Sequence, residues 1–98
     1  MPLCVDPEQN EIQALKGVTD WRGKRVLEVG CGDGRLTRRL AQLGAIVQAN
    51  DPDAGLIEKA RENLPQRFAK KVSYKVGQAE RLAEASEAFD IVVFSWVL

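Results

Sequence analysis

Three closely spaced glycines and two acidic residues are the side chains of this sequence best placed to bind a ligand. Gly30, Gly32 and Gly34 lie between an apolar run and an amphipathic one. Glycine allows a sharp turn there and lets a ligand approach the backbone, while the following helix offers free amides at its N-terminus. Glu28 precedes the loop, and Asp51 follows Gly30 by 21 residues. An acidic residue at that spacing is typical of a carboxylate that accepts hydrogen bonds from both hydroxyls of a ribose.

The spacing of the glycines distinguishes two kinds of nucleoside ligand. The dinucleotide fingerprint is G-x-G-x-x-G, whereas here the third glycine comes one residue early and Arg35 stands in the last position. Glu28 makes the loop more acidic, which suits a cationic ligand and opposes a pyrophosphate at the helix end. The pattern favours a sulfonium nucleoside over a nicotinamide dinucleotide. A glycine turn that serves only tight packing is the alternative.

The elements that must position this loop alternate between short apolar runs and helix-period stretches. Leu36, Leu40 and Leu43 recur at helical spacing after the loop, and Gly44 ends that helix. Strands are predicted at about 25–29, 45–50, 72–76 and 89–98, and the other helices after Asp6, after Asp53 as its cap, and over 79–87. The resulting order α-β-α-β-α-β-α-β predicts an α/β protein with a parallel sheet.

Composition narrows the classes of function. The chain has 98 residues, enough for one small domain, with 14 basic and 14 acidic residues. Zero net charge gives no strong case for binding nucleic acid or an anionic membrane. There is no histidine, and Cys4 and Cys31 form no disulfide pattern, so a zinc site is not expected. No secretory signal and no apolar run of about 20 residues is visible, which predicts a cytoplasmic protein.

Four segments together resemble one enzyme family. LEVGCGDGRLT (27–37) is similar to the first motif of class I S-adenosylmethionine-dependent methyltransferases, acidic-x-G-x-G-x-G. VQANDPDAGLIEKAREN (47–63) resembles that family's second strand, with its ribose-binding acid, and the helix that follows. VGQAERL (76–82) resembles the loop that flanks the adenine, and FDIVVFSWVL (89–98) resembles the fourth strand. The resemblance covers about residues 8–98 and implies a Rossmann-like parallel sheet.

The resemblance implies roles for the residues around the glycine loop. The backbone at Gly30, Cys31 and Gly32 would lie along the methionine end of the cofactor. Glu28 would help to hold the amino group, directly or through water, and Asp51 would accept hydrogen bonds from the ribose hydroxyls. Each acid has another interpretation, since Glu28 can pair with a neighbouring basic residue (Lys24 or Arg25) and Asp51 can simply form a turn. Cys31 is expected to be a small loop residue rather than a nucleophile.

The remaining implied contacts lie on three other segments. Pro52 would lie beside the adenine, and Gln78 and Ala79 would flank its edge. Family members often carry Asp at position 78, but Gln78 can still accept a hydrogen bond through its amide oxygen. Phe94 and Ser95 would line the pocket near the methionine moiety. No catalytic residue and no metal ligand is implied.

The length of the chain predicts an incomplete fold. The family's sheet has seven strands in the order 3-2-1-4-5-7-6, and this chain ends on the fourth. We therefore expect one truncated cofactor-binding domain over 1–98, with an N-terminal helix and lead-in over 1–24 and strand order 3-2-1-4. The C-terminal strands would be absent. The fourth strand would then be an apolar edge, which predicts self-association or a partner that covers it.

Two hypotheses of function follow. The first is a methyltransferase that uses S-adenosylmethionine, releases S-adenosylhomocysteine and acts on a small-molecule acceptor, present here as its cofactor-binding half. The second is a non-catalytic nucleoside-cofactor-binding module, or an incomplete gene product, that turns nothing over. Methyl transfer from a sulfonium depends mostly on alignment of the reactants, so the absence of a predicted base does not separate the two.

Overall fold

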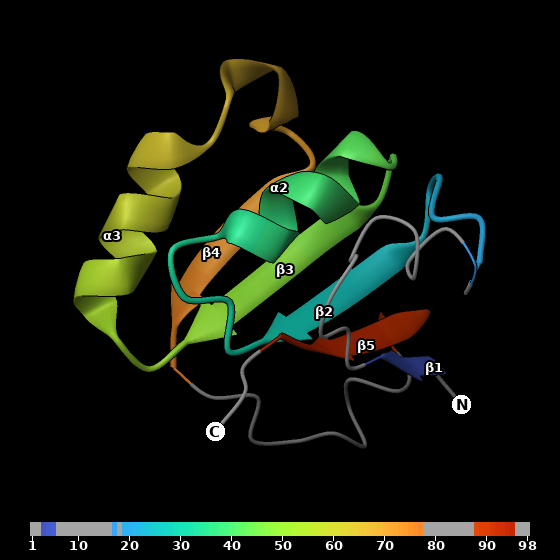
Figure 1. The fold of residues 1–98 in the computed structure, drawn as a ribbon, viewed down its shortest axis with the longest axis horizontal. Coiled ribbons are helices and arrows are strands. Elements are labelled where there is room, and N and C mark those ends of the chain that lie inside the picture. The colour runs from blue at the N-terminus through green and yellow to red at the C-terminus, as the bar shows by residue number, and fades with distance from the viewer. Residues whose placement is uncertain (1–2, 6–16, 18, 78–87, 96–98) are drawn as a thin grey trace.

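Five parallel strands form one sheet in the computed structural model, which describes residues 3–5, 17, 19–77 and 88–95 (Figure 1). The order across the sheet is β1-β5-β2-β3-β4, and each neighbouring pair is parallel. The carboxyl ends of the strands therefore lie along one edge of the sheet. The bounds of the strands are β1 Leu3–Val5, β2 Arg25–Val29, β3 Ile46–Asp51, β4 Val72–Val76 and β5 Ile91–Phe94.

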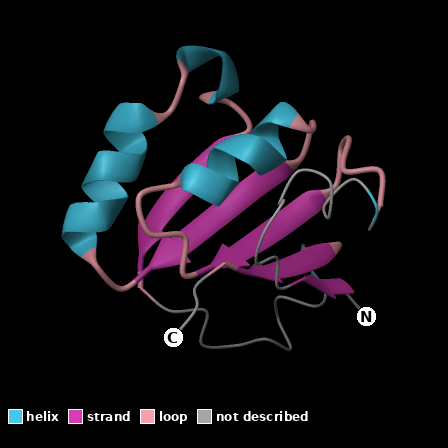
Figure 2. Ribbon diagram, viewed as in Figure 1, coloured by secondary structure: helices cyan, strands magenta, loops and turns pink. Residues whose placement is uncertain are grey.

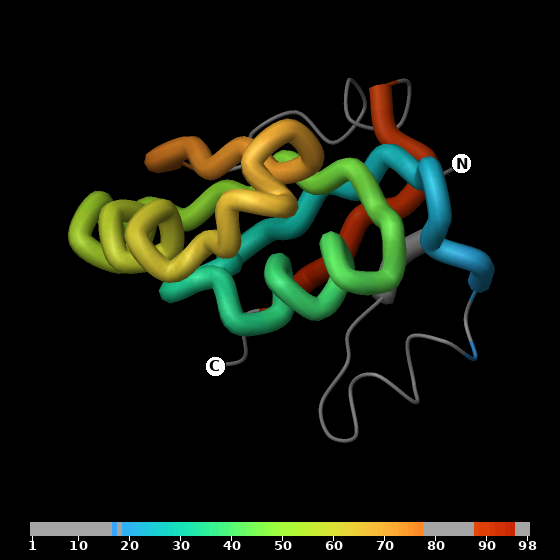
Figure 3. The backbone as a smooth tube through the Cα atoms, turned by 90° about the horizontal axis from the view of Figure 1, so that it is seen from above, coloured from blue at the N-terminus to red at the C-terminus, as the bar shows by residue number. Residues whose placement is uncertain are grey.

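Two α-helices follow the carboxyl ends of β2 and β3. Helix α2 spans Arg35–Gln42 and helix α3 spans Ala54–Asn63, while a short 3-10 turn, η1, spans Gln66–Phe68 before β4 (Figure 2). Figure 3 shows both α-helices on the same side of the sheet. Each connection leads from one parallel strand back to the start of the next, so both helices must cover the sheet on the return.

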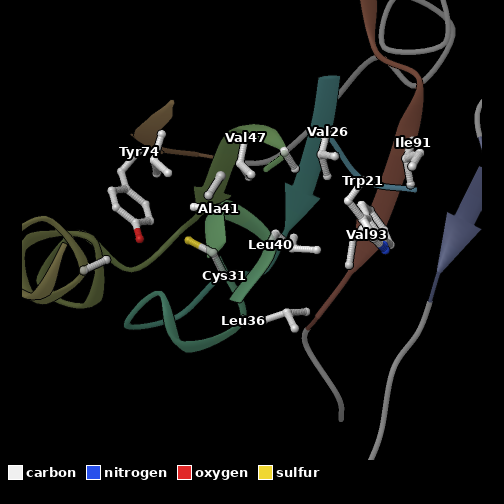
Figure 4. Packing of buried hydrophobic residues seen from close by; sticks show 14 of the residues in the cluster. Trp21, Val26, Cys31, Leu36, Leu40, Ala41, Val47, Tyr74, Ile91 and Val93 are labelled. Carbon is white, nitrogen blue, oxygen red and sulfur yellow. The ribbon is translucent and has the colours of Figure 1, made fainter. Parts of the chain in front are cut away.

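The alternation of side chains along the strands divides the core between the two faces of the sheet. The larger cluster lies under α2 and α3 and contains Leu40, Val47, Ile57 and Val93, all 2% exposed or less (Figure 4). On the opposite face, Leu27 and Val92 are buried, and the half-buried residues Val29, Phe89 and Phe94 pack against them. The strands next to the loop are thus apolar on both faces, as expected for central strands of a parallel sheet.

Most of the predicted elements agree with this fold. Strands 25–29 and 72–76 have the predicted bounds, the strand expected at 45–50 is Ile46–Asp51, and the strand expected at 89–98 is Ile91–Phe94 among the described residues. Asp53 caps α3, since its side chain accepts hydrogen bonds from the N–H groups of Gly55 and Leu56. The helices predicted after Asp6 and over 79–87 lie outside the described residues.

The predicted strand order was incomplete at one edge. The order 3-2-1-4 corresponds to β4-β3-β2-β5, but Leu3–Val5 forms a further strand that pairs with β5 in the register Leu3 to Ile91 and Val5 to Val93. The expectation that the fourth strand is an open apolar edge is therefore wrong, because β1 takes its backbone hydrogen bonds. Self-association remains a prediction, but an open edge at β5 no longer supports it. Three residues are too short a run for a sequence pattern to mark as a strand.

Candidate functional site

The glycine loop crosses the carboxyl end of β3. The N–H groups of Gly30 and Cys31 both donate to the carbonyl oxygen of Asn50, at 2.8 and 3.1 Å, and the N–H of Gly34 donates to the carbonyl of Cys31 at 3.0 Å. Gly32 has a φ of +57°, and apart from its chain neighbours no described residue has a heavy atom within 4 Å of the position that a Cβ would occupy. Hydrogen bonds from the N–H groups of the loop therefore hold it against the end of β3. At Gly32 the loop presents its backbone without a side chain.

Asp51 joins the loop to the start of α3. Its side chain is 5% exposed; one carboxylate oxygen accepts from the N–H of Gly32 at 2.9 Å and the other from the N–H of Asp53 at 2.9 Å. The bond from Asp53 is the turn-forming interaction that was the alternative interpretation of Asp51. The bond from Gly32 links Asp51 to the loop. Each carboxylate oxygen has two lone pairs, so Asp51 retains acceptor capacity at this edge of the sheet.

Glu28 lies beneath the loop and is fully buried. Its carboxylate accepts a hydrogen bond from the hydroxyl of Thr37 on α2. Arg25, one of the two bases considered as its partner, instead forms an ion pair with Asp90, with nitrogen and oxygen 3.6 Å apart. Glu28 thus ties β2 to α2 behind the loop, and its side chain is not exposed at the surface where a ligand would lie.

Cys31 has the environment of a structural residue. Its side chain is 6% exposed, and its thiol lies 3.7 Å from the carbonyl oxygen of Gly32. Burial raises the pKa of Cys31 to about 12, and the negative charges of Glu28 and Asp51 act in the same direction. The thiol is therefore protonated at neutral pH, and a protonated thiol is a poor nucleophile.

The end of β5 reaches the loop through Ser95. The Ser95 hydroxyl donates to the carbonyl oxygen of Gly30 at 3.0 Å, and its N–H donates to the carbonyl of Val29 at 3.1 Å. Phe94 is half-buried and packs on the face of the sheet opposite α2. Pro52 is exposed beside Asp51.

Of the ten predicted site residues, eight are described. The structure brings six of them together at or directly beneath the loop: Glu28, Gly30, Cys31, Gly32, Asp51 and Ser95. Gln78 and Ala79 lie outside the described residues. Their proposed contacts with adenine stay predictions.

Three residues that support the loop were missed by sequence reasoning. Asn50 supplies the carbonyl for Gly30 and Cys31, Thr37 donates to Glu28, and Tyr74 on β4 reaches Gly34 from below. A threonine on the buried side of a helix and a tyrosine on the inward side of a strand were the only signals available. Both are equally typical of ordinary core positions.

Other possible sites are weaker within the described part of the chain. No group of three or more metal-binding side chains occurs there. A cavity of about 380 Å³ is lined by residues that include Arg25, Ile46 and Lys71, at the amino ends of the strands. It therefore lies at the edge of the sheet opposite the glycine loop. Among the described residues, no helix has the length and apolar character needed to span a membrane.

Comparison with known sequences assigns the family. A family model described as a methyltransferase domain matches residues 26–98, from the first residues of β2 to the end of the chain. The chain belongs to this methyltransferase family. Its glycine loop and Asp51 both fall within the matched segment, as does the strand sequence that leads to Ser95.

Individual relatives of this methyltransferase domain agree with that assignment. The ubiquinone biosynthesis O-methyltransferase of Azorhizobium caulinodans is 40% identical over 72 residues, which cover 74% of this chain and 28% of that protein. A crystal structure from Listeria monocytogenes, described as that of an S-adenosylmethionine-dependent methyltransferase, has a TM-score of 0.72 and 26% identity, covering 88% of this chain and 38% of that one.

A third relative has a ligand in its structure. The magnesium protoporphyrin IX methyltransferase from Synechocystis PCC 6803, solved with bound S-adenosylhomocysteine, has a TM-score of 0.67 and 25% identity, covering 85% of this chain and 37% of that one. This methyltransferase domain thus spans about a third of the length of the proteins it matches. Its fold is the Rossmann-like parallel sheet of class I S-adenosylmethionine-dependent methyltransferases.

Proposed function

We propose that this chain binds S-adenosylmethionine at the glycine loop and forms the cofactor-binding half of a methyltransferase for a small-molecule acceptor. The observation that carries the proposal is the bond between Asp51 and the N–H of Gly32. It brings the bare backbone of the loop and a carboxylate together at the carboxyl edge of a parallel sheet, where open α/β sheets bind their ligands.

The residues present fit this cofactor by their chemistry. Among the described residues the space above Gly32 is open, and a Cβ there would meet no atom within 4 Å apart from its own chain neighbours. The carboxylates of Glu28, Asp33 and Asp51 touch or underlie the loop. Within the described part of the chain they outnumber the one guanidinium recorded against it, that of Arg38, which donates to the carbonyl oxygen of Asp33 at 3.0 Å. An acidic surround favours a ligand that carries a sulfonium and an ammonium group, and it opposes the pyrophosphate of a dinucleotide.

In this proposal each described residue has a defined task. The loop backbone from Gly30 to Gly32 lies along the methionine end of the cofactor, and Asp51 accepts hydrogen bonds from the ribose hydroxyls. Glu28 acts from beneath the loop, because its side chain is fully buried and bonded to Thr37. Ser95 holds the carbonyl of Gly30 in place from the side of β5.

The chemistry supplied by the bound cofactor is an electrophilic methyl group on a positively charged sulfur. Transfer of that methyl group to the acceptor would break the carbon–sulfur bond and would leave the electron pair on sulfur as a neutral thioether. The role of this chain would be to align the methyl–sulfur bond with the acceptor and to exclude water from it. In this proposal, the residues that bind the acceptor, and any base that takes its proton, lie outside the cofactor-binding half.

The relatives support one class of acceptor. The Azorhizobium relative is named for O-methylation in ubiquinone biosynthesis, and the end of β5 reads Phe-Ser without an Asn-Pro-Pro or Asp-Pro-Pro signature of amine methylation. A hydroxyl of a small molecule is therefore the proposed acceptor. We propose the cytoplasm as the location of the protein, and the zero net charge supports neither nucleic acid nor an anionic membrane as a partner.

Ligand binding to the chain separates the candidate functions. Calorimetric titration with S-adenosylmethionine, S-adenosylhomocysteine and NADH is expected to give binding of the first two and none of the third. Tight binding of NADH with no response to either sulfur nucleoside would overturn the proposal. Binding without methyl transfer to phenolic acceptors, by a protein that carries this chain together with its acceptor half, would instead favour the non-catalytic module.

A further inference from the structure

Tyr74 stands in one row with Glu28 on the face of the sheet covered by the helices. The register pairs Glu28 of β2 with Ala49 of β3, and Ala49 with Tyr74 of β4, so the three residues are direct neighbours across three strands. Neighbouring strands lie about 4.8 Å apart. The small side chain of Ala49 lies between the two larger ones in this row, and Figure 4 shows the Tyr74 hydroxyl directed to the end of the sheet where Cys31 lies.

The hydroxyl of Tyr74 lies against the last glycine of the loop. A Cβ placed on Gly34 would collide with the Tyr74 oxygen and would stand 3.1 Å from both Cζ of Tyr74 and the Cβ of Ala60. Gly34 also has a φ of +86°, where a side chain is strained in any case. Tyr74 therefore supports the loop at the point where it turns into α2.

This hydroxyl is buried without a hydrogen-bond partner among the described residues. Tyr74 is 6% exposed, and burial raises its pKa to about 12, with the charge of Glu28 acting in the same direction. The nearby hydroxyl of Thr37, which donates its own proton to Glu28, lowers the pKa of Tyr74 and so opposes this shift. A phenylalanine would fill the same space without a polar atom, so for folding alone the hydroxyl is a cost.

We propose that Tyr74 is a positioning residue of the cofactor site. Its hydroxyl fixes the height of Gly34 above the sheet and lies near the Thr37 hydroxyl that bonds Glu28, so that the loop keeps the shape that receives the cofactor. The inference rests on the proposed function, because it assigns a role in binding S-adenosylmethionine or its product. It explains why a polar atom is kept in a place where it does not help the fold.

The substitution Tyr74→Phe tests this role, because it removes only the oxygen. The thermal midpoint of the ligand-free variant is expected to equal or exceed that of the wild type, while its affinity for S-adenosylhomocysteine falls at least about fivefold. Unchanged affinity would overturn the proposal, because the hydroxyl would then be idle. A parallel fall in midpoint and affinity would also overturn it, because the role would then be structural only. Failure of the wild type to bind S-adenosylhomocysteine would overturn the proposed function itself. A wild type that binds, beside a Tyr74→Phe variant of equal affinity, would overturn only the role of Tyr74.

A second pair of variants tests the contact itself. Gly34→Ala is expected to lower the thermal midpoint in the wild type, both by strain and by collision with the Tyr74 oxygen. In the Tyr74→Phe background the nearest ring atom is Cζ at 3.1 Å, so the same substitution is expected to lower the midpoint by about 4 °C less. An equal loss in both backgrounds would show that the oxygen does not set the position of the loop.

Discussion

The bond from Thr37 to Glu28 makes a quantitative prediction about stability. Both side chains are fully buried, and the hydroxyl of Thr37 donates to the carboxylate behind the glycine loop. Thr37→Val keeps the shape and removes the donor. A buried hydrogen bond to a charged group contributes about 1.5–3 kcal/mol, so we expect the free energy of unfolding to fall by about 2 kcal/mol.

The assay is urea unfolding followed by circular dichroism. For a protein of this size, a loss of about 2 kcal/mol lowers the urea midpoint by about 1 M with little change in slope. Thr37→Ser is the matched control, because it keeps the hydroxyl and loses one methyl group, which costs about 1 kcal/mol or less.

Two results would refute the reasoning about Thr37. A Thr37→Val variant within about 0.5 kcal/mol of the wild type would show that the hydroxyl does not stabilise Glu28. A Thr37→Ser variant as unstable as Thr37→Val would show that packing of the methyl group, not the hydrogen bond, is what matters at this position.

Two further predictions concern the loop and the helix that follows it. Asp53→Ala removes the cap of α3 and is expected to cost about 1 kcal/mol, seen as a thermal midpoint about 4–8 °C lower, whereas Glu58→Ala on the exposed side of α3 should change it little. In a Cys4→Ser background, Cys31 is expected to resist a thiol reagent at pH 8 until the protein unfolds, because its pKa is raised to about 12 and its side chain is buried; rapid labelling of the folded protein would contradict this.

The parts of the fold that were predicted correctly depend on local pattern. The alternation in Val72–Val76 and the apolar run at Arg25–Val29 are visible within five residues each, and Asp53 lies where a helix cap is expected from its neighbours alone. The glycine loop was predicted for the same reason, since its three glycines and the flanking acids are close in the sequence.

The parts that were missed depend on contacts between distant segments. Strand β1 is defined by its pairing with β5, some 88 residues further along the chain, and three residues carry no pattern of their own. The sequence indicated Asp51 as a ligand for ribose or as a turn residue, but not that its second oxygen holds Gly32. The approach of Tyr74 to Gly34 depends on Ala49 lying between β2 and β4 in the sheet, which only the register reveals.

The central claim is that the glycine loop and Asp51 form a site for a sulfonium nucleoside. Calorimetric titration of S-adenosylhomocysteine into the wild type and into Asp51→Ala tests it most directly, with Asp53→Ala as the control, because Asp53 is an adjacent carboxylate that caps α3 and makes no bond to the loop among the described residues. We predict binding by the wild type, an affinity at least about tenfold lower for Asp51→Ala, and an affinity within about twofold of the wild type for Asp53→Ala. Equal affinities for the wild type and Asp51→Ala, or no binding by the wild type, would contradict the claim.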